Sequence, residues 1–337
     1  MQYDRPVYRI TLDGQDLSAG LAPRLMSLSL QEHRGEEADQ LDIELSDADG
    51  LLAVPTPGAV LTLALGWAGE PLVDKGTYTV DEAGHRGAPD VISLRARSAD
   101  LTGALRKRTE RSFHDTTLGE IIRSIAGANS LEAVVGDTLD QERVEHIDQT
   151  NESDLNFLTR LGKRYDAVAT VKEGRLLFLL AHGGKTAGGA EMPRHIIYRR
   201  DGDNHDYNHS TRDAYTGVQA SWQDPRGGKK REAIAGTDEN PKKLRDTYAS
   251  ERDALAAAQS EWQRIQRGYA TMKFAMARAM PQLSPQQKVA FADMKPPMGG
   301  VDWLIKTATH SLSESGFTTA LDLELADAPN TGVDLDA

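Results

Sequence analysis

The segment 146–180 constrains the fold most, because it predicts a capped helix followed directly by a hairpin. Its Asn-Glu-Ser-Asp run at 151–154 supplies the short polar side chains and negative charge that a helix N-terminus favours. The runs 167–171 and 176–180 are rich in strand-forming residues and flank a turn that contains Gly174. The segment therefore predicts a helix over 153–165 and a hairpin over 167–180. The helix owes its apolar face to Leu155, Phe157, Leu158 and Leu161.

Residues 6–98 predict a series of short strands. Leu41, Ile43 and Leu45 alternate with polar neighbours, and the same alternation recurs over 61–67 and 92–96. Proline and glycine separate these runs. Short strands at this spacing are typical of a small barrel or sandwich, which we assign to residues 1–100.

The pattern changes to a helical one after Leu101. Apolar residues three and four apart predict a helix over 118–126, which Thr116 or Thr117 can cap. Together with the module at 146–180 this predicts an α+β middle domain over 101–195. The glycine pairs at 183–184 and 188–189 predict a flexible exit from it.

Strand-like runs resume from residue 196 and predict a second β domain over 196–337. We expect strands at 217–222, 272–277, 288–292, 303–310 and 318–325. The polar stretch 224–246 predicts an exposed excursion. A helix over 250–267 follows, with Ser250 and Asp253 as a capping pair and Gly268 as its C-cap. The predicted class is thus a β-rich α+β fold with two β-barrel domains flanking an α+β domain.

The apolar stripe of the helix at 250–267 has two interpretations. The stripe consists of Leu255, Ala258, Trp262 and Ile265. Amphipathic helices usually bury such a face within their own domain. Docking on a neighbouring subunit would bury it equally well, and the sequence does not separate the two.

Composition narrows the classes of function. The chain has 337 residues and a formal net charge of −12, which argues against tight, sequence-independent nucleic-acid binding. It has no cysteine, so neither disulfides nor thiolate chemistry are expected. It shows no secretory signal and no apolar run near the ~20 residues of a membrane span, so we expect a soluble protein without membrane anchoring.

The clusters of ligand-type residues all have simpler structural explanations. Glu152 and Asp154 occupy a helix start. The Asp-Ala-Asp-Gly run at 47–50 fails as a calcium loop, because Leu45 and Thr56 would hold its first and twelfth positions. The Asp and His residues of 201–209 lie among glycine and asparagine, which predicts a polar loop instead of a metal site.

The basic patch at 106–111 contains Glu110 and lacks interleaved aromatic residues, which favours a solvated or salt-bridging segment over a phosphate site. No nucleophile, zinc-protease, Walker or dinucleotide motif occurs. We therefore expect no catalytic, cofactor-binding or metal-binding residues, no cofactor, and no enzymatic activity.

The order of several motifs resembles the late control protein D family, the hub proteins of contractile phage tails and of R-type phage-tail-like bacteriocins. The middle of the chain carries QTNESDLNFLTRL, then YDAVA, then GRLLF. Further matches are Arg24-Leu25 with Asp39, Leu41, Ile43 and Leu45, then FHDTTL at 113–118, and Trp303 with HSL at 310–312 and GFTT at 316–319.

The resemblance implies a homotrimer in which each chain supplies two tube-like barrels, so that three chains present six barrels to a hexameric tail tube. Expected partners are further copies of the chain, the tail tube protein and a trimeric tail spike, with the tape measure and other baseplate proteins as further candidates. The expected location is the tail of a virion or bacteriocin, after synthesis in the host cytoplasm. Whether the particle is a phage or a DNA-free bacteriocin stays open.

Two alternatives come from other classes. One is the hub region of a type VI secretion spike, which is usually fused to its spike, whereas no spike-like repeat follows here. The other is a tail-associated peptidoglycan hydrolase, which would need an acid with a raised pKa beside a cleft.

The excess of negative charge also has two explanations. It could simply favour solubility, or it could belong to the wall of a channel that lets DNA pass without holding it.

Overall fold

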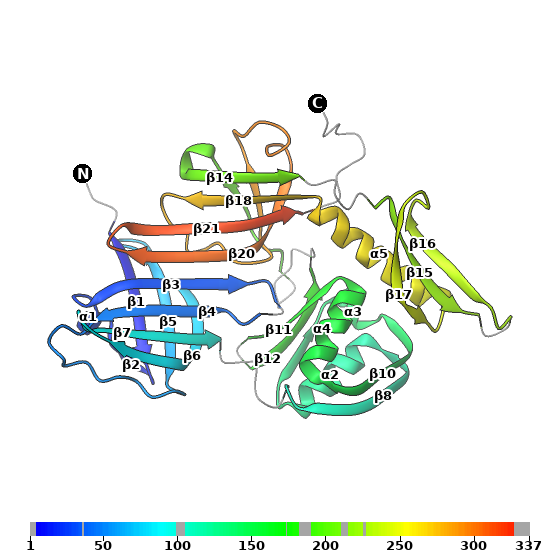
Figure 1. The fold of residues 1–337 in the computed structure, drawn as a ribbon, viewed down its shortest axis with the longest axis horizontal. Coiled ribbons are helices and arrows are strands. Elements are labelled where there is room, and N and C mark those ends of the chain that lie inside the picture. The colour runs from blue at the N-terminus through cyan, green and yellow to red at the C-terminus, as the bar shows by residue number, and fades with distance from the viewer. Residues whose placement is uncertain are drawn as a thin grey trace.

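A computed structural model describes residues 5–35, 37–98, 105–172, 174–181, 190–209, 215–224 and 227–326. Strands dominate it, and its helices lie in the middle and late parts of the chain, apart from the four-residue helix α1 near the N-terminus (Figure 1). This confirms the predicted β-rich α+β class. The predicted glycine-rich exit at 183–189 lies outside the described residues.

The first β unit, residues 6–98, is an antiparallel sheet in the order β3-β4-β7-β6-β5-β1. Strands β1 and β5 run steeply across the direction of β3, β4 and β7, so the sheet curls around its core (Figure 1). Leu41, Ile43 and Leu45 face that core, as their alternation predicted. The elements are β1 (Pro6–Leu12), β2 (Gln15–Asp16), α1 (Ser18–Leu21), β3 (Leu25–His33), β4 (Gln40–Ser46), β5 (Val60–Trp67), β6 (Val73–Arg86) and β7 (Val91–Ser98).

The second β unit, residues 194–209 and 270–326, has the order β14-β18-β21-β20, with β19 pairing to the first part of β20 and β13 to β19. The four late strand predictions are confirmed here as β18 to β21. Its own apolar core includes Phe274, Trp303 and Leu321. The elements are β13 (Arg194–Ile197), η1 (Arg199–Asp201), β14 (Gly202–His209), β18 (Ala270–Met276), β19 (Lys288–Phe291), β20 (Asp302–Ser313) and β21 (Gly316–Leu325).

The two β units are joined edge to edge by β20, which changes partner at a bulge between Ile305 and Thr307. Before the bulge it pairs with β19, and after it Thr307–Ser313 pairs antiparallel with Ser27–His33 of β3. We call this second pairing the seam. Both units therefore belong to one 13-stranded sheet. Leu312 and Phe317 also enter the core of the first unit.

The middle unit, residues 105–181, packs two helices against a two-stranded ribbon, β8-β10, and a three-stranded sheet, β11-β12-β9. Thr117 caps α2 in a capping box with Glu120, and Ser153 caps α4. Both predicted helices and the hairpin are confirmed. The elements are β8 (Arg108–Thr117), α2 (Leu118–Ala128), β9 (Glu132–Val135), α3 (Asp137–Asp140), β10 (Arg143–Ser153), α4 (Asp154–Tyr165), β11 (Ala167–Lys172) and β12 (Arg175–Leu180).

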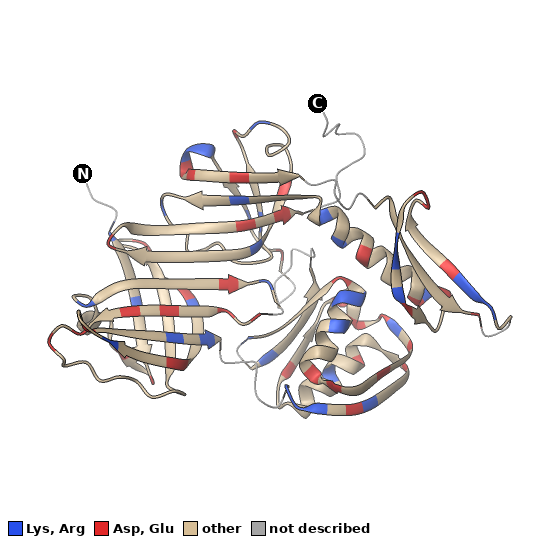
Figure 2. Cartoon of the chain, in the orientation of Figure 1, with Lys and Arg blue, Asp and Glu red and all other residues tan. Residues whose placement is uncertain are grey.

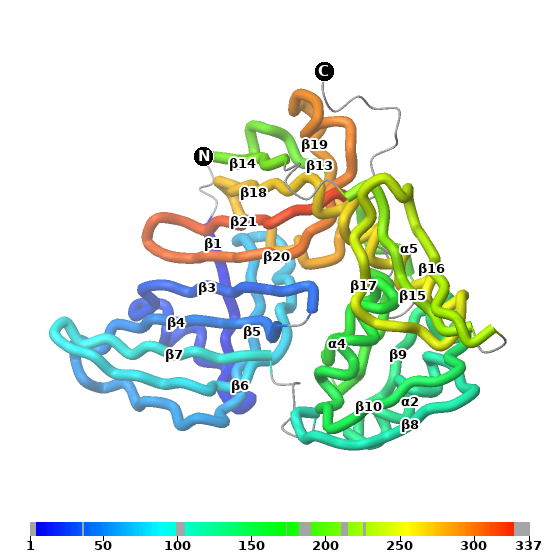
Figure 3. Tube along the Cα trace, turned by 45° about the vertical axis from the view of Figure 1, so that its right-hand side comes forward, coloured from blue at the N-terminus to red at the C-terminus, as the bar shows by residue number. Residues whose placement is uncertain are grey.

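Residues 215–268, which follow β14 and precede β18 in the sequence, form a projection that we call the arm (Figures 1 and 3). Helix α5 (Glu251–Gly268) packs on a sheet of β16 (Lys230–Gly236), β15 (Gly217–Gln223) and β17 (Pro241–Tyr248). Most of the polar stretch expected as an excursion is thus strand. Its alternating small residues, Ala233 and Ala235, are buried under α5 and carried a weak strand signal.

The predicted helix at 250–267 is confirmed as α5 with Ser250 as its N-cap, although Tyr269 and not Gly268 is the C-cap residue. Three residues of the predicted stripe face the arm core, with Ala258 fully buried and Trp262 and Ile265 partly buried against it. Ala254 and Ala258 are fully buried against the arm sheet, whereas Leu255 is 37% exposed. Small alanine side chains at 254 and 258 allow the helix to approach the sheet closely. The face packs within the chain.

We expect Gly217→Ala to destabilise the arm, because a Cβ there would lie 2.3 Å from the carbonyl oxygen of Thr237 and 2.6 Å from that of Ala235. Real Cβ atoms do not come that close to backbone, so β15 and β16 would have to separate. Gly268→Ala is the control, since nothing lies within 4 Å of its Cβ and alanine favours a helix by about 0.5–1 kcal/mol. Amide hydrogen exchange of residues 215–268 measures both, and equal protection in the two variants would contradict the packing described.

Candidate functional site

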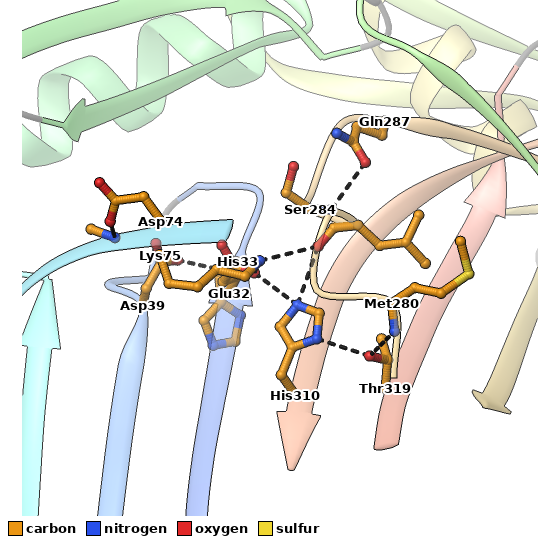
Figure 4. A network of polar contacts seen from close by, with 12 residues as sticks. Glu32, His33, Asp39, Asp74, Lys75, Met280, Ser284, Gln287, His310 and Thr319 are labelled. Carbon is orange, nitrogen blue, oxygen red and sulfur yellow. Dashed lines mark hydrogen bonds and ion pairs between the residues drawn. The ribbon is translucent and has the colours of Figure 1, made fainter. Parts of the chain in front are cut away.

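The seam encloses a network of buried polar side chains (Figure 4). Glu32 comes from β3, Lys75 from β6, His310 from β20 and Thr319 from β21, so four strands of both β units supply it. All four residues are buried, and His310 and Thr319 are fully so. The carbonyl oxygen of Leu283, in the segment between β18 and β19, completes the group.

The distances define which atoms donate. Lys75 Nζ lies 2.6 Å from Glu32 Oε2, and His310 Nε2 lies 3.1 Å from the same oxygen and 3.2 Å from the carbonyl oxygen of Leu283. Because Nε2 faces two acceptors, the imidazole proton is on Nε2. Nδ1 then accepts from the Thr319 hydroxyl at 2.9 Å, and that oxygen accepts the Met280 N–H at 3.1 Å.

Burial governs the charges of this network. Burial lowers the pKa of His310, so the imidazole is neutral at pH 7. Burial alone would raise the pKa of Glu32, but the hydrogen bond from His310 and the charge of Lys75 outweigh it and hold that pKa below its usual range. The network therefore contains the ion pair of Lys75 with Glu32 and the neutral imidazole of His310, which donates one hydrogen bond and accepts another. Its members stabilise each other, since none of them has water to replace a lost partner.

A second buried network ties the arm and the middle unit to the second β unit. Arg267, near the end of α5, contacts Asp166 with both terminal nitrogens at 2.6 and 2.5 Å. Its Nε lies 3.2 Å from Glu324 of β21, which also pairs with Arg34 from the turn after β3. Asp166 holds the left-handed position that ends α4, at φ 49°. Three parts of the chain thus meet at one guanidinium.

A third tie joins the first β unit to the middle unit. The carboxylate of buried Asp39 accepts the His33 N–H at 2.7 Å and lies 3.2 Å from Lys172 Nζ of β11. Gly35 lies against the same hairpin, and a Cβ at that position would come within 2.4 Å of Val168 Cγ1. A cavity of about 640 Å³ lies beside Arg267, Asp166 and Glu324 and is lined by residues of all four parts of the chain.

The carboxylates at the start of α4 have structural roles, in agreement with their interpretation from sequence. Asp154 is buried and accepts hydrogen bonds from Gln149, Asn129 and Arg111 at 2.7–2.8 Å. Burial alone would raise its pKa, but these hydrogen bonds outweigh burial and lower it. Glu152 pairs with Arg160 at 2.8 Å. Arg111 of the basic patch at 106–111 thus forms a salt bridge with buried Asp154.

The Asp and His residues of 201–209 were expected in a loop, and that expectation is wrong. All but Asp201, which ends η1, lie on strand β14, which pairs with β18 along its length. The partner strand supplies the hydrogen bonds that outweigh the weak strand propensity of glycine and asparagine. In the turn at 47–50, Asp49 pairs with Arg24 at 2.5 Å, and Asp47 accepts the Leu52 N–H at 2.9 Å. Across the described residues, no three His, Asp or Glu side chains are grouped as a metal site.

The seam network was missed by sequence reasoning, although the strand pattern held a signal for it. Glu32 follows Leu28 and Leu30 at two-residue spacing, so it faces the core. His310 shares an inward face with Ala308 and Leu312 in the same way. A charged or imidazole side chain at an inward position of an alternating strand requires a buried partner.

The fold of this chain is similar to that of several solved structures. A 43 kDa tail protein of prophage MuSo2 from Shewanella oneidensis matches with a TM-score of 0.70 over 96% of this chain and 99% of that one, at 16% identity. A type VI secretion system component of E. coli matches with a TM-score of 0.58 at 12% identity, over 90% of this chain and 73% of that one. The fold is therefore that of phage tail proteins and their relatives.

The chain belongs to the phage tail baseplate hub (GPD) family, whose model matches residues 36–316. A protein described as a probable baseplate hub protein of Escherichia phage 186 is 42% identical over 95% of this chain and 93% of its own length. The protein is thus a structural component of a phage tail. In the part of the chain that the structure describes, no helix is long and apolar enough to cross a membrane.

We expect Lys75→Met to destabilise the chain by about 3–5 kcal/mol, because Glu32 would keep a buried charge without its cation. The double variant Glu32→Gln, Lys75→Met should recover much of that loss, since it removes both charges. Lys273→Met is the control, as its side chain is 77% exposed and surface changes stay within about 0.5 kcal/mol. Denaturant unfolding measures all three, and equal losses in single and double variants would contradict the coupling.

The lowered pKa of His310 makes the stability of the seam sensitive to mild acid. As pH falls below about 6.5, the unfolded imidazole takes up a proton before the folded one, so the free energy of unfolding decreases. His310→Gln keeps a donor and an acceptor but does not titrate. The stability advantage of the natural protein over this variant should shrink by about 1 kcal/mol between pH 7.5 and 5.5. Parallel pH profiles would contradict a neutral, buried His310.

Proposed function

We propose that the protein is a trimeric symmetry adapter, which joins a hexameric tail tube to a trimeric spike. The supporting observation is the single sheet that holds two β units in one chain. Three such chains would present six barrel-like units to the tube on one side and keep three-fold symmetry on the other. We take residues 1–100 and 196–337 as the two tube-like barrel domains, and residues 101–195 as the α+β domain between them.

The free strand edges support ring formation. Within the described residues, β14 pairs only with β18, and β13 only with β19. Strand β1 pairs with β5 along its length, whereas on its other side only Thr11 and Leu12 pair with β2. Unpaired edges promote association with another chain, and a closed ring would satisfy them. The edges lie in different β units, as a head-to-tail ring of three chains requires.

The edge at β13 also exposes apolar side chains. Ile196 is 54% exposed and Tyr198, which follows the strand, is 39% exposed. Aromatic and aliphatic side chains at a free sheet edge favour contact with a neighbouring subunit. We propose this edge as part of the subunit interface.

The buried ties suit a hub that carries load. Contraction would push on the β units through the tube, and the seam would pass that force between them through backbone hydrogen bonds. The networks at Arg267 and at Asp39 would hold the arm and middle unit in place meanwhile. Acidic and basic residues are interspersed over the strands of both β units (Figure 2), which favours solubility as the explanation of the net charge of −12.

The phage-tail assignment has more support than the type VI alternative. The phage relative is 42% identical and matches over nearly its whole length, whereas the type VI likeness rests on the fold alone. We propose no enzymatic role and no cofactor. The proposed partners are two further copies of the chain, the tail tube protein and a spike, with the tape measure and other baseplate proteins as further candidates. The proposed location is the virion or bacteriocin tail after assembly in the host cytoplasm.

Light scattering of the purified chain tests the assembly, with an expected mass of about 110 kDa from three chains of 36.8 kDa. Ile196→Glu should shift the protein toward the monomer at a concentration where the natural chain is trimeric, because it places a charge in the proposed interface. Leu255→Glu, at an exposed site on α5, is the control and should leave the mass unchanged. A stable dimer or tetramer would contradict the proposed ring. A trimer that Ile196→Glu leaves unchanged would contradict the proposed interface.

A further inference from the structure

The ribbon of β8 and β10 carries two histidines on its exposed face. His114 and His146 are direct cross-strand partners, next to the pair formed by Ser112 and Asp148. Their rings stack with centroids 4.5 Å apart and planes inclined by 25°. The two Nδ1 atoms lie 3.0 Å from each other. This close approach of two ring nitrogens has no part in the core of the middle unit, which Phe113 and Ile147 contact from the opposite face.

Asp148 determines which nitrogen of His146 carries the proton. His146 Nε2 lies 3.1 Å from Asp148 Oδ2, and the Ser112 hydroxyl donates to Oδ1 of the same carboxylate at 2.6 Å. The carboxylate of Asp148 thus accepts one hydrogen bond from the Ser112 hydroxyl and one from the N–H at Nε2 of His146. Neutral His146 therefore has its lone pair on Nδ1, directed toward His114. Histidines that bind metals commonly donate their other N–H to a carboxylate in this way.

We propose that His114 and His146 form a surface site for a divalent transition-metal ion, bound between their Nδ1 atoms. Imidazole suits Ni²⁺, Cu²⁺ and Zn²⁺. With metal–nitrogen bonds of about 2.0–2.1 Å, a separation of 3.0 Å corresponds to roughly a right angle at the metal. That angle matches neighbouring positions in the tetragonal geometry of Ni²⁺ or Cu²⁺.

The site is accessible and open. The side chains of His146 and Asp148 are 44% and 45% exposed. Both line a cleft of about 910 Å³ between the middle unit and the arm, together with Asn156 and Arg160 of α4. In the structurally described ranges no third ligand-type side chain joins the pair as a metal site, so the two imidazoles supply two positions and water fills the others. A direct hydrogen bond between the rings would explain the same 3.0 Å distance without a metal.

Calorimetric titration of the untagged full-length chain with NiCl₂ at pH 7.5 separates these explanations. We expect one Ni²⁺ per chain, and an affinity at least tenfold lower in His114→Asn and in His146→Asn, because each variant removes one of two ligands. Asp148→Asn should weaken binding about tenfold, since it releases the ring orientation. His85→Asn is the matched control, because its side chain is also 44% exposed but lies on β6, outside the pair.

The electron paramagnetic resonance spectrum of one equivalent of Cu²⁺ provides a second readout, with two coordinated nitrogens in the natural chain and one in His114→Asn. Thermal unfolding without metal should be the same in all variants, since the substituted side chains are exposed. A natural chain without stoichiometric Ni²⁺ binding would overturn the site. So would equal Ni²⁺ affinity in the natural chain, His114→Asn and His146→Asn. The test does not depend on trimer formation or on a place in the tail.

Discussion

The pairing of β20 with β3 is the interaction on which the rest of the structure depends. It joins two β units into one sheet. The part of β20 before its bulge pairs with β19 of the second unit, and the part after the bulge pairs with β3 in the seam. Beneath these paired strands, Lys75 and Glu32 form an ion pair, and the neutral imidazole of His310 lies within hydrogen-bond distance of Glu32. A buried carboxylate without its cation would be costly, so the network favours the one register in which Glu32, Lys75 and His310 meet.

The other parts of the chain are fixed to this sheet by a few charged side chains. Arg267 links α5, the end of α4 and β21, and Asp39 links the turn after β3 to the hairpin of the middle unit. The contacts of Arg267 are buried, so water competes with them less than with a surface pair, whereas the side chain of Lys172, which pairs with buried Asp39, is partly exposed. In the part of the chain that the structure describes, the arm and the middle unit are thus each fixed by side-chain contacts in addition to their covalent connections.

Much of the local structure could be predicted from the sequence, since capping signals and periodicity act over short distances. Ser153 and Thr117 marked their helices correctly, and the alternation of Leu41, Ile43 and Leu45 marked an inward face. The seam could not be predicted, because nothing near His310 specifies that its strand pairs with residues almost three hundred positions earlier. Strand β15 and helix α5 of the arm were predicted, whereas β16 and β17 were missed. Both missed strands are mostly polar, and only Ala233 and Ala235 of β16, beneath α5, carried a weak strand signal.

We propose that one chain occupies two positions of the tail tube, and this can be tested by counting the chains in an assembled tail. Reconstruction of the tail end by electron cryomicroscopy, without imposed symmetry, would count them. We expect three copies related by a three-fold axis, with six β units, two from each chain, facing the last ring of the tube. Six copies, or a ring in which only one β unit of each chain faces the tube, would contradict it.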